Sequence, residues 1–317
     1  MGKKYGSGPT ILVVDDDPEL RELVSFALTR EGFDVAVAEN AFIGLARLDE
    51  VKPAVTLLDV MMPGMSGLEM LARLREHDRD MPIIIMTAAA TPDIAFSALR
   101  DEACDFLAKP FHLDDLISAV STAFEMRQQQ IGIEVLSARP DWIEFRVPCN
   151  LQAIEPLERM LLQLKTDIPP DTRDQIAYAF REMLRNAIEH GGKYDPTQRV
   201  EVGYLRTARM ILYRLKDPGA GFTFDSLQTP AGPIAGVLNP ADDPTLHMRA
   251  REELGLRPGG FGILIARSMA DEVCYNERHN EVILIKYLDG APLPPATAAI
   301  TDERAETTTE STEPVER

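Results

Sequence analysis

Five polar residues in the first half of the chain stand where short apolar runs end. Asp15 and Asp16 follow the first run, Asp59 the third, Thr87 the fourth and Lys109 the fifth. Carboxylates packed together repel one another unless a divalent cation lies among them, and an oxygen-rich, water-accessible cluster suits Mg²⁺. A hydroxyl and an ammonium group beside that cation can hold the oxygens of a transferred phosphoryl group. The set therefore predicts phosphoryl chemistry.

Part of the acidic run has a simpler explanation. Asp17 followed by Pro18 is a good N-cap and first-turn pair for a helix, so we interpret Asp17 as a cap. A helix cap does not explain Asp15 and Asp16 or the three later residues. We therefore keep the interpretation of these five residues as a phosphoryl site.

These residues need a sheet that brings strand ends together. Apolar runs alternate with amphipathic segments from Thr10 to about Gln130. This alternation predicts a five-stranded parallel sheet, doubly wound with helices on both faces, with ligands beyond the carboxyl ends of the strands. The expected strands are Ile11–Val14, Val35–Ala38, Val55–Leu58, Ile83–Met86 and Phe106–Ala108.

The segments VVDDD, LLDVMMPGMSG, MTA and LAKPF, in this order and spacing, resemble the chemotaxis-type response-regulator receiver family over residues 10–128. The resemblance implies that Asp59 accepts the phosphoryl group and that Thr87 and Lys109 grip its oxygens. It also implies that Mg²⁺ is bound by Asp15, Asp16, Asp59 and the carbonyl of Met61, and that Phe106 is the switch aromatic.

The receiver resemblance makes two backbone predictions. The peptide bond between Lys109 and Pro110 should be cis, because this proline lies at the turn that aims the lysine into the site. Glu102 stands where the family usually has glycine, which predicts a reshaped turn before the fifth strand.

A second constellation lies in the other half of the chain. Glu182 and Asn186 have i,i+4 spacing and share one face of an expected helix. The segment Asp217-Pro-Gly-Ala-Gly221 follows a strand, and Gly259-Gly-Phe-Gly262 opens a helix. Glycines let the backbone approach a nucleotide, and a helix N-terminus supplies amide donors for phosphate. A solvated helix face and two turns would explain each piece alone, but the ordered combination predicts an ATP site.

Residues 133–288 resemble a Bergerat-fold (GHKL, HATPase) domain, and EMLRNAIEHG with GGFGILIARSMADEV is similar to the anti-sigma-factor serine kinases. The resemblance implies Mg²⁺-ATP as ligand, with Asn186 on the metal, Asp217 on the adenine amino group and Glu182 as general base. Glycines 219 and 221 would line the base, and glycines 260 and 262 would meet the phosphates. We interpret His112 and His190 as structural.

The expected fold is therefore an α/β receiver followed by an α+β Bergerat-fold sandwich with a mixed sheet and helices on one face. The second half should contain strands at 133–136, 142–147, 199–205, 210–216, 272–275 and 281–287 and helices at 151–164, 171–190 and 261–270. The proline-rich connection at 225–258 is expected to be either disordered or a functional lid. The predicted segments are an N-terminal tail (1–9), the receiver (10–128), a linker (129–132), the ATP domain (133–288) and an acidic disordered tail (289–317).

The composition argues against several partners. A formal net charge of -18 repels nucleic acid, and no apolar run approaches the roughly 20 residues that span a bilayer. Met1 to Pro9 lacks the apolar stretch of a secretory signal, so we expect a cytoplasmic protein with neither nucleic-acid nor membrane partners. Cys104, Cys149 and Cys274 are widely separated and predict buried structural thiols.

The leading hypothesis is a bacterial-type two-component response regulator. An upstream histidine kinase or phosphotransfer protein would phosphorylate Asp59, and the receiver would control an ATP-dependent protein serine/threonine kinase whose partner is an anti-sigma antagonist or a sigma factor. One alternative is an ATP-dependent switch that sequesters a partner without phosphoryl transfer. Another is an atypical histidine kinase lacking its own histidine module. The sequence does not determine the oligomeric state, and a homodimer is one possibility.

Overall fold

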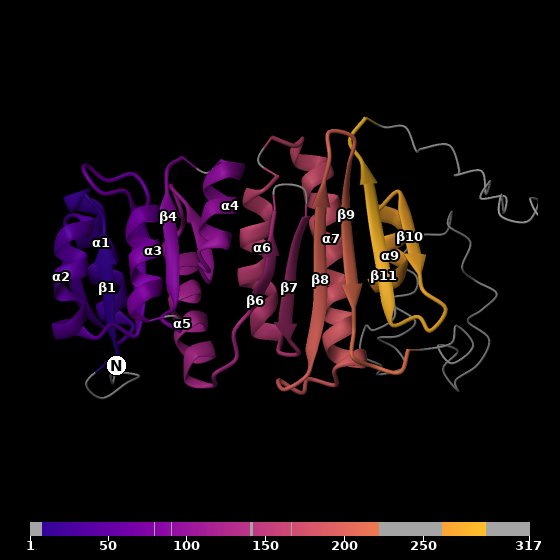
Figure 1. The fold of residues 1–317 in the computed structure, drawn as a ribbon, viewed down its shortest axis with the longest axis horizontal. Helices are drawn as coiled ribbons and strands as arrows, with labels where there is room; N and C mark the ends of the chain where they lie inside the picture. Colours follow the sequence, from indigo (N-terminus) through magenta and orange to yellow (C-terminus); the bar gives the residue numbers. More distant parts are fainter. Residues whose placement is uncertain are drawn as a thin grey trace, which may run out of the picture.

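The computed structural model of the chain describes residues 8–78, 80–89, 91–139, 142–165, 167–221 and 262–289. Two domains lie next to each other along its long axis, with the N-terminal domain in indigo to magenta and the C-terminal domain in rose to yellow (Figure 1). The proline-rich connection at 225–258, Gly260 and the predicted tail beyond residue 289 lie outside the described residues. None of the described helices is long and apolar enough to cross a membrane.

The N-terminal domain is a parallel sheet of the strand order β2-β1-β3-β4-β5. All five predicted strands are confirmed, and the central strands are buried along their whole length because helices cover both faces. The strands are β1 (Thr10–Val14), β2 (Asp34–Ala38), β3 (Val55–Asp59), β4 (Ile83–Thr87) and β5 (Asp105–Ala108). The helices are α1 (Pro18–Arg30), α2 (Ala41–Val51), α3 (Gly67–His77), α4 (Pro92–Arg100) and α5 (Leu113–Gln128).

Local signals in the sequence set the ends of these helices. The side chain of Asp17 accepts hydrogen bonds from the backbone N–H groups of Glu19 and Leu20, which confirms its interpretation as the cap of α1. Ser66 and Glu69 form a capping box at the start of α3. These caps fix where each helix leaves the carboxyl edge of the sheet.

The turn before β5 contains a non-glycine residue with a positive φ angle. Glu102 has φ 60°, in the left-handed region, and Arg75 donates a 2.7 Å hydrogen bond to its carbonyl oxygen. A non-glycine residue therefore takes a left-handed conformation that favours glycine, and the hydrogen bond from Arg75 supports it there; whether the turn is reshaped relative to the family stays a prediction. The peptide bond between Lys109 and Pro110 is cis, as predicted.

The C-terminal domain is one six-stranded sheet of the order β10-β11-β9-β8-β7-β6. Its strands are β6 (Glu134–Ala138), β7 (Trp142–Pro148), β8 (Arg199–Arg206), β9 (Met210–Lys216), β10 (Glu272–Tyr275) and β11 (Glu281–Tyr287). Every described pair is antiparallel, which corrects the predicted mixed sheet. The reason is the connectivity: four of the five pairs join consecutive strands, three of them through short hairpin turns and the fourth, β7 with β8, through two helices that return the chain.

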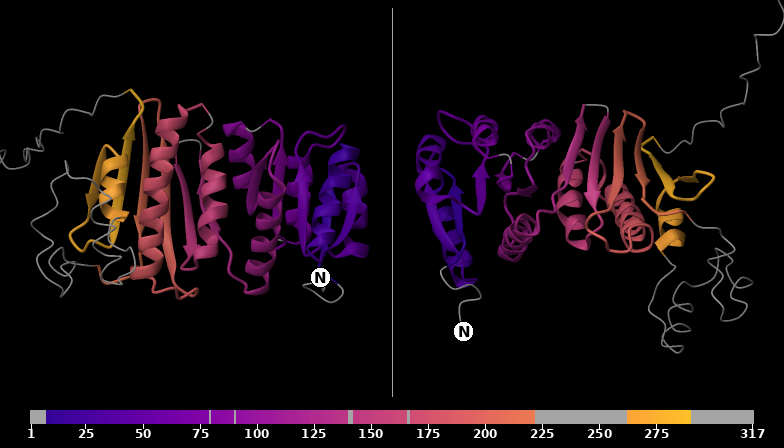
Figure 2. Two further views of the ribbon diagram at one scale, coloured as in Figure 1. Left: turned by 180° about the vertical axis from the view of Figure 1, so that it is seen from behind. Right: turned by 60° about the horizontal axis from the view of Figure 1, so that its bottom comes forward.

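Helices cover one face of this sheet, as predicted (Figure 2). They are α6 (Ile154–Gln163), preceded by the short 3₁₀ helix η1 (Leu151–Ala153), α7 (Pro170–Asn186), which continues into a π-helical turn η2 (Ala187–Gly191), and α9 (Gly262–Met269). The other face carries charged residues around Arg214, which lies within ion-pair distance of Glu144, Glu201 and Glu281. The sheet alternates buried and partly exposed residues accordingly.

The two domains share an interface. Helix α6 packs against β5 and α4, and strand β6 packs against α4. The guanidinium of Arg159 on α6 donates two hydrogen bonds to the carboxylate of Asp105 on β5, one of them from Nε at 2.8 Å. Gln152 donates a further 2.7 Å bond to Glu125 at the end of α5. The receiver-like domain therefore lies directly on the first helix of its neighbour.

Candidate functional site

The three predicted carboxylates meet at the carboxyl edge of the N-terminal sheet. Ligand oxygens of Asp15, Asp16 and Asp59 lie within 4.8 Å of one another. Asp15 and Asp59 are buried at the ends of the neighbouring strands β1 and β3, whereas Asp16 is exposed. The cluster is thus anchored by the sheet and open to water on one side.

Lys109 contacts two of the three carboxylates, and Thr87 ends the neighbouring strand β4. The ammonium Nζ of Lys109 lies 2.6 Å from Oδ2 of Asp15 and 3.1 Å from Oδ1 of Asp59. The backbone N–H of Lys109 donates to the carbonyl of Thr87 at 2.8 Å, so the ends of β4 and β5 are tied together. Thr87 is fully buried, and its hydroxyl accepts a bond from the N–H of Ala89.

The electrostatics of the cluster favour an additional cation. Burial raises the pKa of Asp59, and the negative charge of Asp15 raises it further, against the lowering effects of Lys109 and the backbone N–H of Met61. Burial lowers the pKa of Lys109, but its hydrogen bond to Asp15 and the charges of both carboxylates outweigh this and leave it raised. One ammonium therefore serves two buried carboxylates. Three carboxylates with one open side suit a Mg²⁺ ion, which keeps several waters when bound.

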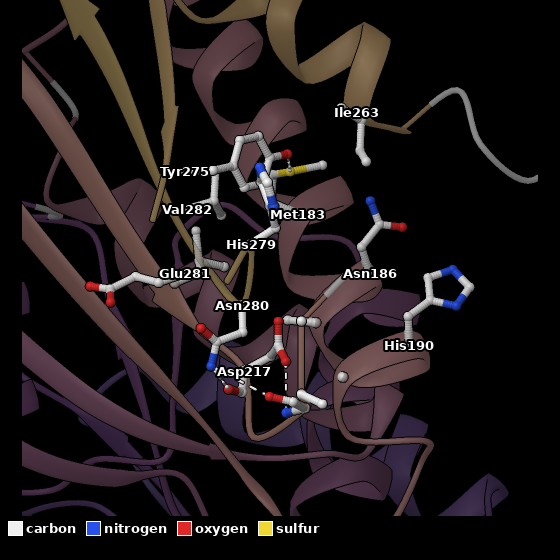
Figure 3. Close-up of a pocket in the computed structure, with 16 residues that line it drawn as sticks. Met183, Asn186, His190, Asp217, Ile263, Tyr275, His279, Asn280, Glu281 and Val282 are labelled. Atoms are coloured by element: carbon white, nitrogen blue, oxygen red, sulfur yellow. Dashed lines mark hydrogen bonds between the residues drawn. The ribbon is translucent and has the colours of Figure 1, made fainter. Parts of the chain in front are cut away.

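A cavity of about 290 Å³ lies in the C-terminal domain between α7, the loop after β9, the start of α9 and the β10–β11 hairpin (Figure 3). Its lining contains four predicted residues: Asn186, Asp217, Gly219 and Gly221. The apolar walls come from Met183, Leu215, Ile263 and Val282. Such a mainly apolar cavity with a few convergent polar groups is typical of a small-ligand site.

Asp217 is held on the cavity wall by its surroundings. Its Oδ1 accepts a 2.8 Å hydrogen bond from the N–H of Gly219. Burial raises the pKa of Asp217, and the Gly219 N–H opposes this. A Cβ on Gly191 would lie 2.4 Å from the carboxyl carbon of Asp217, so a larger residue there would displace the Asp217 side chain.

Three other predicted residues of the ATP site are not among the described residues that line the cavity. Glu182 lies one turn before Asn186 on α7, and it is not among the residues that line the cavity. Gly262 is the first residue of α9, whose next residue, Ile263, lines the cavity. Gly260 lies outside the described residues.

The sequence interpretation missed several lining residues. His190, interpreted as structural, lines the cavity beside Asn186 (Figure 3), and Tyr275, His279 and Asn280 line it from the hairpin. His190 could have been found from the sequence, because it lies four residues after Asn186 and therefore on the same face of the helix. The sequence contains no such signal for the hairpin residues, because their position next to the cavity depends on the pairing of β11 with β9.

Other sequence interpretations have mixed outcomes. His112 is the exposed N-cap residue of α5 and makes no side-chain cap bond. Cys149 is buried, but Cys104 is only partly buried and Cys274 is exposed, so the prediction of three buried thiols was wrong. Cys274 lies on β10 at the edge of the sheet, where no further strand covers it among the described residues.

Comparison with known proteins separates the same two halves. Residues 11–121 match the family model "Response regulator receiver domain", and residues 147–286 match "Histidine kinase-like ATPase domain". A solved response regulator receiver domain protein from Clostridium thermocellum is 28% identical and covers 38% of this chain and 98% of that chain, with a TM-score of 0.37.

Curated relatives agree with the first match. The regulatory protein AtoC of Escherichia coli (strain K12) is 37% identical over 126 residues, covering 40% of this chain and 27% of AtoC. The transcriptional regulatory protein TrcR of Mycobacterium tuberculosis is 41% identical over 113 residues, covering 36% of this chain and 44% of TrcR. The chain thus spans less than half the length of either protein.

A longer match decides the family. The phosphate regulon transcriptional regulatory protein PhoB of Pseudomonas aeruginosa is 32% identical over 212 residues, covering 65% of this chain and 90% of PhoB. This chain belongs to the response regulators. In this response regulator the receiver domain is followed by a histidine kinase-like ATPase domain, as the two resemblances in the sequence implied.

Proposed function

We propose that this response regulator takes a phosphoryl group onto Asp59 and thereby controls an ATP-dependent protein serine/threonine kinase in its C-terminal domain. The observation that carries the proposal is the direct packing of the receiver on α6, the helix that in turn packs against α7 of the ATP cavity. An upstream histidine kinase or phosphotransfer protein would donate the phosphoryl group, and an anti-sigma antagonist or a sigma factor would be the downstream partner.

The receiver residues support the first step. A carboxylate oxygen of Asp59 would attack the phosphorus of a phosphohistidine, so that an acyl phosphate forms as the phosphorus–nitrogen bond breaks and the imidazole takes up a proton. Lys109 and Thr87 would neutralise and hydrogen-bond the phosphoryl oxygens. Mg²⁺, held by Asp15, Asp16, Asp59 and the Met61 carbonyl, would supply further charge neutralisation when bound.

The residues of the C-terminal cavity support nucleotide binding. Asp217 would accept a hydrogen bond from the adenine amino group, and Gly219 and Gly221 would lie against the base. Asn186 would hold the Mg²⁺ that accompanies the phosphates, and the amides at the start of α9, with Gly262 and Gly260, would meet the phosphates themselves. Glu182, one turn away, would accept the proton of a serine or threonine hydroxyl presented by a partner.

A chain of contacts supports communication between the two sites. Lys109 directly follows the strand β5, which begins at Asp105, and Asp105 pairs with Arg159 on α6. The neighbouring residue on α6, Glu158, is buried and accepts a 2.7 Å hydrogen bond from Arg181 on α7. Arg181 directly precedes Glu182. These contacts give β5 a continuous physical connection to the helix that carries Asn186.

One alternative function has an observation in its favour. Because Glu182 is not among the residues that line the cavity, the C-terminal domain could bind ATP and sequester a partner without transferring phosphate. This alternative keeps the nucleotide site and the control by the receiver, but it removes the general base.

One experiment separates these functions. The protein is incubated with γ-labelled ATP and candidate partner proteins, and the label on the partner is then tested for stability in acid. Acid-stable label on serine or threonine supports the kinase. ATP binding without label supports the sequestering switch, and acid-labile phosphohistidine would replace both with a histidine kinase.

A further inference from the structure

The turn of the β10–β11 hairpin touches the loop that carries Asp217. The backbone N–H of Asp217 donates to the carbonyl of Asn280 at 2.9 Å. In return, the side-chain amide of Asn280 donates to the carbonyl oxygens of Asp217 and Gly219, each at 3.4 Å. Asn280 thus contacts the Asp217 loop through both its backbone and its side chain, and Figure 3 shows it next to Asp217 on the cavity wall.

A second asparagine fixes the orientation of this amide. The Nδ2 of Asn276 donates to Oδ1 of Asn280 at 2.9 Å, and Oδ1 of Asn276 accepts from the backbone N–H of Asn280 at 3.1 Å. Since the Asn280 oxygen is engaged by Asn276, its Nδ2 is the group left to face the two carbonyls. Asn276 and Asn280 thus form a hydrogen-bonded connection, here called the Asn276–Asn280 relay, from the hairpin turn to the Asp217 loop.

The far end of the same loop meets the same turn. Gly221 has φ 85°, and a Cβ at this position would lie 1.7 Å from the carbonyl oxygen of Arg278. The turn at residues 276–280 therefore contacts the loop at Asp217, at Gly219 and at Gly221. Such a three-point contact restricts where the Asp217 carboxylate can lie.

We propose that Asn280, held by Asn276, is a positioning residue that sets the choice of purine base. This inference rests on the proposed ATP site. One carboxylate oxygen of Asp217 accepts from the N–H of Gly219. In the proposed site the other oxygen would be the acceptor for an exocyclic amino group. Adenine presents an amino donor there, whereas hypoxanthine presents a carbonyl oxygen that would face the carboxylate without a proton between them. A fixed carboxylate discriminates between the two bases, and a loosened one does so less.

Titration calorimetry on the full chain with Mg²⁺-ATP and Mg²⁺-ITP tests the proposal. The variants are Asn280→Ala, the near-isosteric Asn280→Asp and Asn276→Ala, with Glu277→Ala in the same turn as the control. We expect the preference for ATP over ITP to fall about tenfold in all three relay variants and to stay unchanged in the control. The double variant N276A/N280A should lose no more preference than N280A, because both act through one amide.

Three outcomes would overturn the inference. If both nucleotides weaken equally, the relay only supports the fold. If a folded Asn280→Asp protein, with a cooperative thermal transition, keeps the full preference for ATP, the amide does not position Asp217. Should the unchanged protein bind neither nucleotide, the ATP site itself is wrong and the inference falls with it, which distinguishes that failure from the first two.

Discussion

Arg159 of α6 and Asp105 of β5 form a two-contact ion pair across the boundary between the receiver and the ATPase domain. The Asp105 side chain is 2% exposed, and that of Arg159 is 15% exposed. Burial raises the pKa of Asp105, and the hydrogen bonds and charge of Arg159 oppose this shift. The pair therefore joins two domains at a place where the Asp105 carboxylate, without Arg159, would be buried with no charged partner, whereas Arg159 also pairs with Glu155 on its own helix.

Arg159→Ala should destabilise the protein strongly. The substitution leaves the Asp105 carboxylate buried and unpaired, and breaking such a pair from one side costs about 3–5 kcal/mol. Urea unfolding gives the loss. Arg100→Ala is the matched control, because Arg100 pairs with Asp101 at the surface and its removal should change stability little. Equal effects of the two substitutions would show that the interdomain pair is not buried in solution.

Asp59→Asn should stabilise the fold at neutral pH in the absence of divalent cations. The substitution removes a carboxyl group whose pKa is raised above 3.8 mainly by burial. A raised pKa means that the folded state binds the proton more tightly, so wild-type stability falls as pH rises from 3.8 through the folded pKa. The advantage of the variant should therefore shrink as pH is lowered through that window.

Thermal unfolding of both proteins across this pH range gives the comparison. Added Mg²⁺ should stabilise the wild type more than Asp59→Asn, because the variant has lost one carboxylate of the cluster. A stability difference that does not depend on pH would contradict the direction of the Asp59 shift.

Asp59→Asn should also abolish labelling of the receiver by acetyl phosphate. The amide keeps the volume of the side chain but is not a nucleophile, so no acyl phosphate can form. Labelled full-length protein, resolved on a gel that preserves acyl phosphates, reports the result. Continued labelling of the variant would place the acceptor on another residue.

Asn186→Ala and Glu182→Gln should have different effects on the ATPase domain. Asn186 lines the cavity, so its removal should weaken Mg²⁺-ATP binding by about tenfold or more. Glu182 is not among the lining residues, so Glu182→Gln should bind the nucleotide normally and lose transfer to a partner. Calorimetry and γ-labelled ATP measure the two properties. Equal loss of binding in both variants would remove the division of roles.

Much of the receiver site could be predicted because it depends on one rule. Parallel strands share a carboxyl edge, so Asp15, Asp59 and Lys109 had to converge once the strands were recognised. The contact between Arg159 and Asp105 could not be predicted, since the two residues are 54 positions apart and an arginine on an amphipathic helix is typical of a solvated face. The position of Asn280 beside Asp217 could not be predicted for a related reason, since it depends on the register of β11 against β9.

Communication between the two sites is tested most directly by measuring Mg²⁺-ATP affinity of the full chain with and without beryllofluoride at Asp59. Control by the receiver predicts a change of about 5- to 150-fold between the two states, the usual range for coupled sites. The change should be absent in Asp59→Asn, which cannot hold the phosphoryl mimic in the same way. Equal ATP affinity with and without beryllofluoride, in protein shown to have bound it, would contradict control of the ATPase domain by the receiver.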